Sequence, residues 1–314
     1  MLVACIFFSS CNQKQNKNDT LLTENSLNEF SDSLSYYNFQ IQKEPSNHLH
    51  YYYKSKVLFS KKENKQALEA INQSLNIDSN KTYSIFLKSN ILFNLNHFSA
   101  SKRELEKCIV IDSNHVAAYL KLSEMYFYLK DYNQAFLHIN KALRKDIHNY
   151  YGYFLKGLIY KEIGDTLKAV SNFQTSIEQN PEHYHSFIQL GLLHQKNEKQ
   201  IALSIQYFYS AIKSDSTNPE GYYHRGLSYQ NIGKYTEALG DYKKVIQLDS
   251  TFAKAYYNSG YIYFKQDSIK QAASFFDLSI KWDSSYKDAY YNRALCAEAL
   301  GDKVLAEKYF KLSR

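Results

Sequence analysis

A period of 34 residues constrains the fold of this chain more than any other feature. Eight positions spaced 34 residues apart, with a single spacing of 35, hold only small residues: Ser55, Ser89, Ser123, Gly157, Gly191, Gly226, Gly260 and Ala294. A bulky residue stands four positions before each of them: Tyr51, Ile85, Tyr119, Tyr153, Phe187, Tyr222, Tyr256 and Tyr290. Repetition at this interval indicates one supersecondary unit stacked many times. Because each unit packs only on its neighbours, such an array offers a long binding surface.

Each unit is predicted to be two antiparallel helices joined by a short turn. In residues 116–149, small or bulky apolar residues recur at helical spacings, first at Tyr119, Leu122, Ser123 and Tyr126, then at Ala135, Ile139, Ala142 and Leu143. The chain holds only 3 Pro and 10 Gly, which favours long helices over a turn-rich sheet protein. The sequence therefore predicts an all-α fold.

This pattern resembles the tetratricopeptide repeat over residues 48–314. Besides the small eighth position, a small twentieth position recurs at Ala67, Ser101, Ala135, Ala169, Ser204, Ala238, Ala272 and Ala306. A bulky twenty-fourth position recurs at Ile71, Leu105, Ile139, Phe173, Phe208, Tyr242, Phe276 and Phe310. The resemblance implies a right-handed α-solenoid of about eight repeats. Their expected ranges are 48–81, 82–115, 116–149, 150–183, 184–218, 219–252, 253–286 and 287–314.

The repeat ends depart from the family pattern in one respect. The usual proline survives as Pro181, whereas Asp-Ser stands there at Asp78, Asp112, Asp215, Asp249 and Asp283. Asp and Ser are good turn and helix-capping residues, so we expect the break between repeats to be kept.

At the N-terminus, an apolar run over residues 2–8 is followed by Ser9-Ser10-Cys11 and then by a polar stretch. This pattern resembles a bacterial lipoprotein signal peptide. The resemblance implies a signal peptide over 1–10, acylation of Cys11 and a polar tether over 11–25. Asn12 rather than Asp follows the cysteine, which in this family implies transport to the outer membrane. The alternative is an uncleaved apolar N-terminus of a cytoplasmic protein. A transmembrane anchor is not expected, because seven apolar residues are too few to span a bilayer, which takes about 20.

The two ends of the array are expected to differ. A capping-box pattern at residues 26–29, ahead of Pro45, predicts an N-terminal capping helix within 26–44. At the other end an apolar edge is expected at Leu305, Tyr309 and Leu312. We expect this edge to fray, and weak dimerisation through it is the alternative.

The family resemblance also indicates where a partner binds. In tetratricopeptide repeats, the first helices line the concave surface. The candidate groove residues on these helices are Phe127, Phe154, Tyr223, Tyr257, Asn258, Tyr261, Tyr291 and Asn292. Aromatic rings suit a peptide ligand because they bury a large area with few rotors, and amide side chains can pair with its backbone. The alternative is that these aromatic residues pack inside the repeats.

Other site chemistries are not expected. The net charge is +7, but Lys is interspersed with acidic residues, so no nucleic-acid partner is predicted. The chain has no Gly-rich phosphate loop or nucleophile motif, and the pairs His48/His50 and His183/His185 have no further ligand at a helical interval. We therefore predict no cofactor, no metal and no enzymatic activity.

Three functions remain open from the sequence. The first is a lipid-anchored scaffold that binds a protein or peptide partner in its groove at a bacterial envelope. The second is a glycan- or nutrient-binding lipoprotein whose tyrosines stack on sugars. The third is an unlipidated cytoplasmic adaptor.

Overall fold

The computed structural model describes residues 33–314. The expected signal peptide, Cys11, the tether and the start of the capping helix lie outside these residues. The chain divides into two compact units, which meet in sequence at Asp131 and Tyr132. Within residues 33–314 the regular secondary structure is α-helical apart from one 3₁₀ turn, and no strand occurs there.

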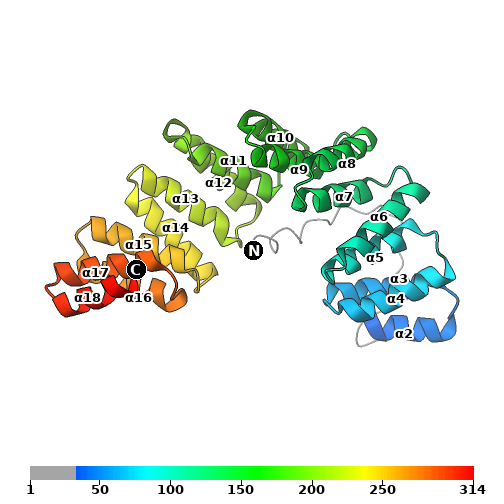
Figure 1. Ribbon diagram of the computed structural model, residues 1–314, viewed down its shortest axis with the longest axis horizontal. Helices are drawn as coiled ribbons and strands as arrows, with labels where there is room; N and C mark the ends of the chain where they lie inside the picture. The colour runs from blue at the N-terminus through cyan, green and yellow to red at the C-terminus, as the bar shows by residue number, and fades with distance from the viewer. Residues whose placement is uncertain (1–32) are drawn as a thin grey trace. The chain divides into compact units, whose positions relative to one another are not determined.

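Unit 1 contains the helices drawn from blue to green in Figure 1. They are α2 (Ser33–Lys43), α3 (His48–Ser60), α4 (Asn64–Ile77), α5 (Thr82–Asn94), α6 (Phe98–Ile111) and α7 (Val116–Tyr128). Helix α3 packs on α4 and α5 packs on α6, while α4–α5 and α6–α7 contacts join successive pairs. Helix α2 covers α3, and its Tyr37 ring stacks on Tyr53 with centroids 5.6 Å apart.

Unit 2 continues the same arrangement. Its helices are α8 (Tyr132–Lys145), α9 (Tyr150–Glu162), α10 (Thr166–Gln179), α11 (Tyr184–Gln195), α12 (Ile201–Ser214), α13 (Pro219–Asn231), α14 (Tyr235–Leu248), α15 (Ala253–Lys265), α16 (Ile269–Trp282), α17 (Lys287–Ala299) and α18 (Lys303–Leu312). Helices α9 to α18 form five antiparallel pairs that stack in chain order. The predicted all-α solenoid architecture of helix pairs is thus confirmed within each unit.

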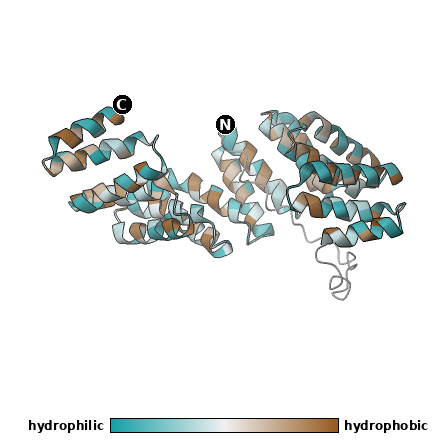
Figure 2. Ribbon diagram, turned by 90° about the horizontal axis from the view of Figure 1, so that it is seen from below, coloured by the Kyte–Doolittle hydropathy of each residue, from teal (hydrophilic) through white to brown (hydrophobic). Residues whose placement is uncertain are grey.

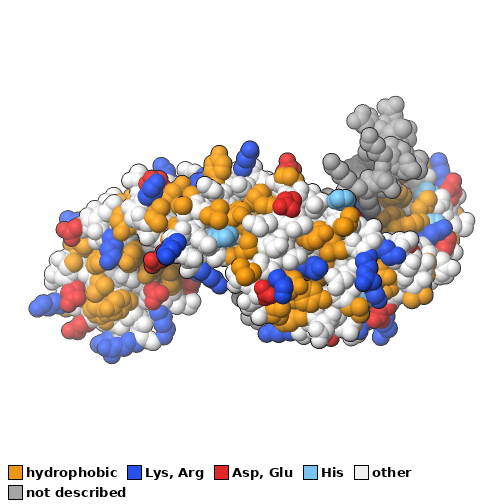
Figure 3. All heavy atoms as spheres, turned by 90° about the horizontal axis from the view of Figure 1, so that it is seen from above, with side chains coloured by type: hydrophobic (Ala, Val, Ile, Leu, Met, Phe, Trp, Pro, Cys, Tyr) orange, Lys and Arg blue, Asp and Glu red, His pale blue; other side chains and the backbone are white. Residues whose placement is uncertain are grey.

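The second helices of the repeats, such as α4, α8 and α16, are amphipathic. First helices such as α5 and α7 have more buried residues. Figure 2 shows hydrophobic and hydrophilic residues side by side on the helices. On the face drawn in Figure 3, Lys/Arg and Asp/Glu side chains are interspersed. No helix within residues 33–314 is both long enough and apolar enough to cross a bilayer.

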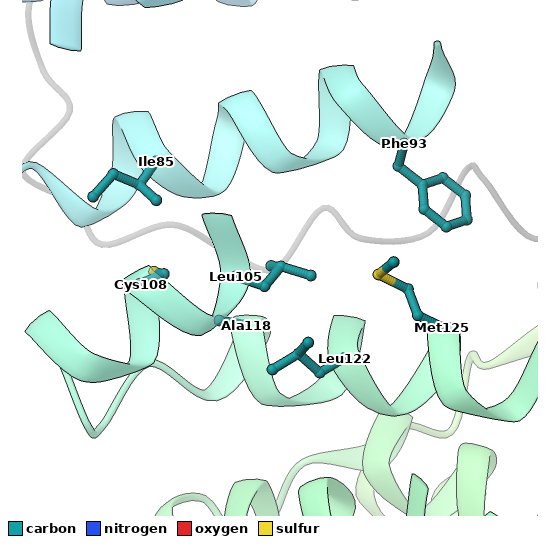
Figure 4. Close-up of a cluster of buried hydrophobic side chains, with 7 residues drawn as sticks. All are labelled: Ile85, Phe93, Leu105, Cys108, Ala118, Leu122 and Met125. Atoms are coloured by element: carbon teal, nitrogen blue, oxygen red, sulfur yellow. The ribbon is translucent and has the colours of Figure 1, made fainter. Parts of the chain in front are cut away.

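The core is a series of clusters between successive helix pairs. Figure 4 shows one in unit 1, where side chains from α5, α6 and α7 meet. Leu105 and Leu122 are fully buried there, beside the thiol of Cys108. Because each cluster draws on neighbouring helices only, the core runs along the stack rather than lying at one centre.

The small eighth position lets the two helices of a repeat approach closely. A Cβ atom built on Gly191 would lie 2.4 Å from Cε1 of Phe208, which is fully buried on α12. The same relation holds for Gly157 with Phe173, Gly226 with Tyr242 and Gly260 with Phe276. In unit 1 the hydroxyl of Ser55 instead donates to the carbonyl of Ala67 at 2.7 Å. The periodic small and bulky positions are therefore two sides of one packing contact.

The turn inside each repeat has a recurring left-handed residue. Backbone φ is positive at Lys62, Asn96, Lys130, Gly164, Gly233, Asp267 and Gly301. These residues end the first helix of every repeat except the fifth, where a 3₁₀ turn (Glu198–Gln200) takes the place of the left-handed residue. The fifth repeat is also the one with 35 residues, so the 3₁₀ turn accommodates its insertion.

The repeat ends are held by aspartate side chains. Oδ1 of Asp112, Asp249 and Asp283 accepts a hydrogen bond of 2.9 Å from the backbone N–H two residues later. Asp78 and Asp215 make the same turn. This bond fixes the turn that proline supplies elsewhere in the family.

Candidate partner-binding surface

Four predicted residues of unit 2 form a hydrogen-bonded series, which we call the Asn–Tyr ladder. Nδ2 of Asn258 on α15 donates to Oη of Tyr223 on α13 at 3.4 Å. Nδ2 of Asn292 on α17 donates to Oη of Tyr257 on α15 at 3.0 Å. Each bond joins the first helices of two successive repeats across 35 residues. The structure therefore brings these four residues together on one face of the stack.

The two ladder tyrosines are partly buried and firmly placed. The Tyr223 ring lies 5.0 Å from the ring of Phe252, and the Tyr257 ring lies 4.8 Å from that of Tyr286. Burial raises the pKa of both phenols, so they stay protonated at neutral pH. Since each Oη accepts from an asparagine, its own O–H can donate to a ligand carbonyl.

Two further predicted tyrosines extend this surface. Tyr261 on α15 is half-buried, and Nζ of Lys265 lies 5.5 Å from its ring centroid. Tyr291 on α17 is 50% exposed, and its ring lies 5.6 Å from that of Phe310. Tyr291 and Phe310 line an open hollow between α17 and α18 together with Glu307, Lys311, Ser313 and Arg314. Both tyrosines are therefore accessible to a partner.

The remaining two predicted groove residues have other surroundings. Phe154 is only 1% exposed, and its ring packs 4.9 Å from that of His183 and 5.8 Å from that of Phe173. A ring covered in this way supports the surface but does not contact a ligand, so the alternative of internal packing applies to Phe154. Phe127 lies in unit 1, on α7, half-buried beside Tyr128.

The predicted C-terminal edge is only partly open. Leu312 is 50% exposed, and Leu305 is half-buried. Tyr309 is held by two contacts. Its Oη donates to Oδ1 of Asp277 at 3.3 Å, and the guanidinium of Arg293 lies 5.0 Å from its ring.

Two charged residues that the sequence did not single out lie on the first helices of unit 2. Lys161 lies in the last turn of α9, and its Nζ donates to Oε1 of Gln189 on α11 at 2.7 Å. Glu220 begins α13 and is also half-buried. Burial lowers the pKa of Lys161 and raises that of Glu220, and each charge partly offsets the effect on the other. The only sequence signal was that Lys161 takes a position held by Phe59, Phe93 and Phe127 in the first three repeats.

The histidine just before α11 is buried and neutral. His183 is 4% exposed, and its Nδ1 lies 2.8 Å from Oγ of Ser186, which donates to Oγ of Ser176. Its Nε2 is buried without a hydrogen-bond partner in the described chain. Burial, helped by the nearby His185, lowers the pKa of His183 to about 3. Within residues 33–314 no three His, Cys, Asp or Glu side chains gather as metal ligands.

Comparison with known families identifies the repeat. A family model described as "TPR repeat" matches residues 231–267, and one described as "Tetratricopeptide repeat" matches residues 150–183 and 253–286. Tetratricopeptide repeats are therefore found in residues 150–183 and 231–286. The ranges 150–183 and 253–286 are also those that the 34-residue period assigns to the fourth and seventh units.

Solved tetratricopeptide structures are similar in fold. PilF of Pseudomonas aeruginosa matches with a TM-score of 0.55 and 16% identity, over 63% of this chain and 89% of that one. PilW, described as a widely conserved type IV pilus biogenesis factor, matches with a TM-score of 0.53 and 20% identity, over 62% and 90%. The identities are low, so this likeness concerns the fold alone. No curated protein matches the chain in sequence.

Proposed function

We propose that this protein is a scaffold that binds a protein or peptide partner along the first helices of unit 2. The Asn–Tyr ladder is the observation that carries this proposal. It repeats with the period of the fold, so a ligand lying along the stack meets the same group at each step. Partly buried rings give it apolar contact area, and the phenol O–H groups supply hydrogen bonds to its backbone. Tetratricopeptide repeats in the chain support a scaffold for protein–protein interaction.

Removing two aromatic rings from this surface should weaken binding. We expect Tyr257→Ala with Tyr261→Ala to weaken binding of the partner by tenfold or more, because truncating an aromatic anchor of an interface typically costs more than about 1 kcal/mol. The partner is first identified by crosslinking the full chain in its native membranes and purifying the adducts. The affinity of this partner is then measured for the unaltered chain and for the double variant.

The matched control is Tyr209→Ala, which removes a 59% exposed tyrosine from the second helix α12. It should bind the partner as the unaltered chain does, and circular dichroism should show all three proteins folded. Equal affinity of the double variant would exclude this surface as the binding site. Recovery of an oligosaccharide in place of a protein would favour the glycan-binding alternative.

We also propose that Cys11 is acylated and holds the scaffold at a bacterial envelope, in the outer membrane. The support is the sequence alone: an apolar run, small residues, Cys11 and a polar stretch. Each methylene of an acyl chain buried in lipid contributes about 0.8 kcal/mol, so more than one chain gives stable anchoring.

Labelled palmitate provides a direct test of this anchor. We expect label in the full chain and in Cys5→Ala, but none in Cys11→Ala, because only the residue after the cleavage site receives the lipid. The Cys11→Ala protein should leave the membrane fraction. Unlabelled, fully soluble protein in all three cases would instead favour the cytoplasmic adaptor.

A further inference from the structure

Lys161 and Glu220 are half-buried on the proposed binding surface, yet neither has an ion-pair partner in the described chain. Lys161 lies in the last turn of α9, and Glu220 lies in the first turn of α13, two repeats further along the stack. No ion pair joins them, and Glu220 makes none with any other residue of the described chain. Lys161 has one neutral hydrogen-bond partner, Gln189. Each of these two half-buried charges therefore lacks an ion-pair partner in the described chain.

Charges of both signs act on Lys161. Glu162 and Glu220 favour its charged form, whereas Lys196 at the end of α11 opposes it. Elsewhere on the protein, charges of both signs stand out from the surface, as in Figure 3, where water screens them. The half-buried pair is different, because burial weakens the hydration of each group and strengthens its attraction to an incoming opposite charge.

Hydrogen bonds hold the helices on which the two charges lie. Gln195 Nε2 on α11 donates to the carbonyl of His224 at 2.9 Å and to Oγ of Ser228 at 2.8 Å, which joins α11 to α13. The N-terminus of α13 is capped by Asn218, whose Oδ1 accepts from the backbone N–H of Glu220 at 3.0 Å. The backbone that carries Glu220 is therefore fixed relative to α11, and the Lys161 ammonium is fixed to α11 by Gln189.

We propose that Lys161 and Glu220 select a partner segment by the order of its charges. The segment places an acidic side chain at Lys161, a basic side chain at Glu220 and apolar residues along the Asn–Tyr ladder. This inference rests on the proposed function and names the chemistry of the partner. The Asn–Tyr ladder lies on α13, α15 and α17. Along the stack, Lys161 on α9 therefore comes first, Glu220 on α13 second and the rest of the ladder last, which fixes the order of charged and apolar residues in the segment.

A charge exchange tests the proposal on the full chain. Randomised peptides displayed on phage are selected on the unaltered protein and on Lys161→Glu with Glu220→Lys. The unaltered protein should enrich peptides in the order acidic, basic, apolar, and the exchanged protein should enrich the order basic, acidic, apolar. Each should bind the other's peptides about tenfold more weakly, since an unmatched charge at an interface is unfavourable.

The controls separate this inference from the proposed function. Exchanging the exposed pair Lys234 and Glu237 on the second helix α14 should leave the enriched order unchanged. The neutral variants Lys161→Met and Glu220→Gln should each lose selection at one charge only, and they serve if the exchanged protein does not fold. Enriched peptides without a charge order, or an order that survives the exchange, would overturn the inference and leave the scaffold intact. No enrichment over an unrelated protein would overturn both.

Discussion

Gly191→Val is expected to lower the free energy of unfolding by about 3 kcal/mol, the upper range for overpacking a core. A Cβ at this position would lie 2.4 Å from Cε1 of Phe208 and 2.7 Å from Cδ1. Phe208 is fully buried between α11 and α12 and cannot turn away without moving its neighbours. The helix pair must therefore separate. The midpoint of urea unfolding and faster hydrogen exchange in α11 and α12 would measure the effect.

A second helical glycine provides the control for this prediction. Gly240 lies inside α14, is exposed, and has no atom within 4 Å of a Cβ built on it. Gly240→Ala should stabilise the protein by about 1 kcal/mol, because alanine favours the helix without meeting a neighbour. Opposite effects at two helical glycines would show that contact, not helix propensity, decides Gly191. If Gly191→Val unfolded at the midpoint of the unaltered chain, the close packing of α11 on α12 would be excluded.

The sequence predicted such contacts well because packing between repeats is periodic. Gly191 and Phe208 occupy the small eighth and bulky twenty-fourth positions, and the same two positions meet at Gly226 and Tyr242. Because the role of such a position recurs in every unit, the sequence shows its residue type eight times. The turns between repeats could be predicted for the same reason, because aspartate recurs at the repeat ends in place of proline. Its side chain accepts a hydrogen bond from the backbone and so fixes the turn.

The binding surface could be predicted only in part, because the same position has different surroundings in different repeats. Phe154 and Tyr223 both hold a fifth position, yet Phe154 is covered by the ring of His183. Tyr223 instead carries a phenol oxygen that accepts from Asn258. Lys161 and Glu220 come from different repeats and different positions, so no period marks them. Residues without a recurring role in the stack break the pattern on which the prediction depends.

Acidification from pH 7 to pH 4 is expected to lower the free energy of unfolding by about 3 kcal/mol through His183 alone. The imidazole has an ordinary pKa of 6.5 in the unfolded chain, and burial lowers it to about 3 in the fold. Below pH 6.5 the unfolded chain therefore binds a proton that the folded chain does not. The stability contributed by the neutral imidazole is complete above pH 6.5 and falls by up to about 1.4 kcal/mol per pH unit until pH approaches 3.

His183→Gln tests the origin of this loss. Glutamine can still donate and accept hydrogen bonds near Ser186 and Ser176, but it does not titrate. The difference in unfolding free energy between pH 7 and pH 4 should therefore shrink by about 3 kcal/mol in this variant, whatever its stability at pH 7. His148→Gln, at an exposed site before α9, should keep the full pH dependence.

Half-buried His224, whose pKa desolvation lowers to about 4, accounts for part of the acid sensitivity that remains in His183→Gln. The two effects should add, because His183 and His224 belong to different repeats and act through separate protons. Imidazole resonances followed by NMR would show His183 titrating only at the acid limit of the folded state. Equal pH dependence of His183→Gln and the unaltered chain would mean that His183 is hydrated and charged in solution. The close packing of its ring on Phe154 would then not persist there.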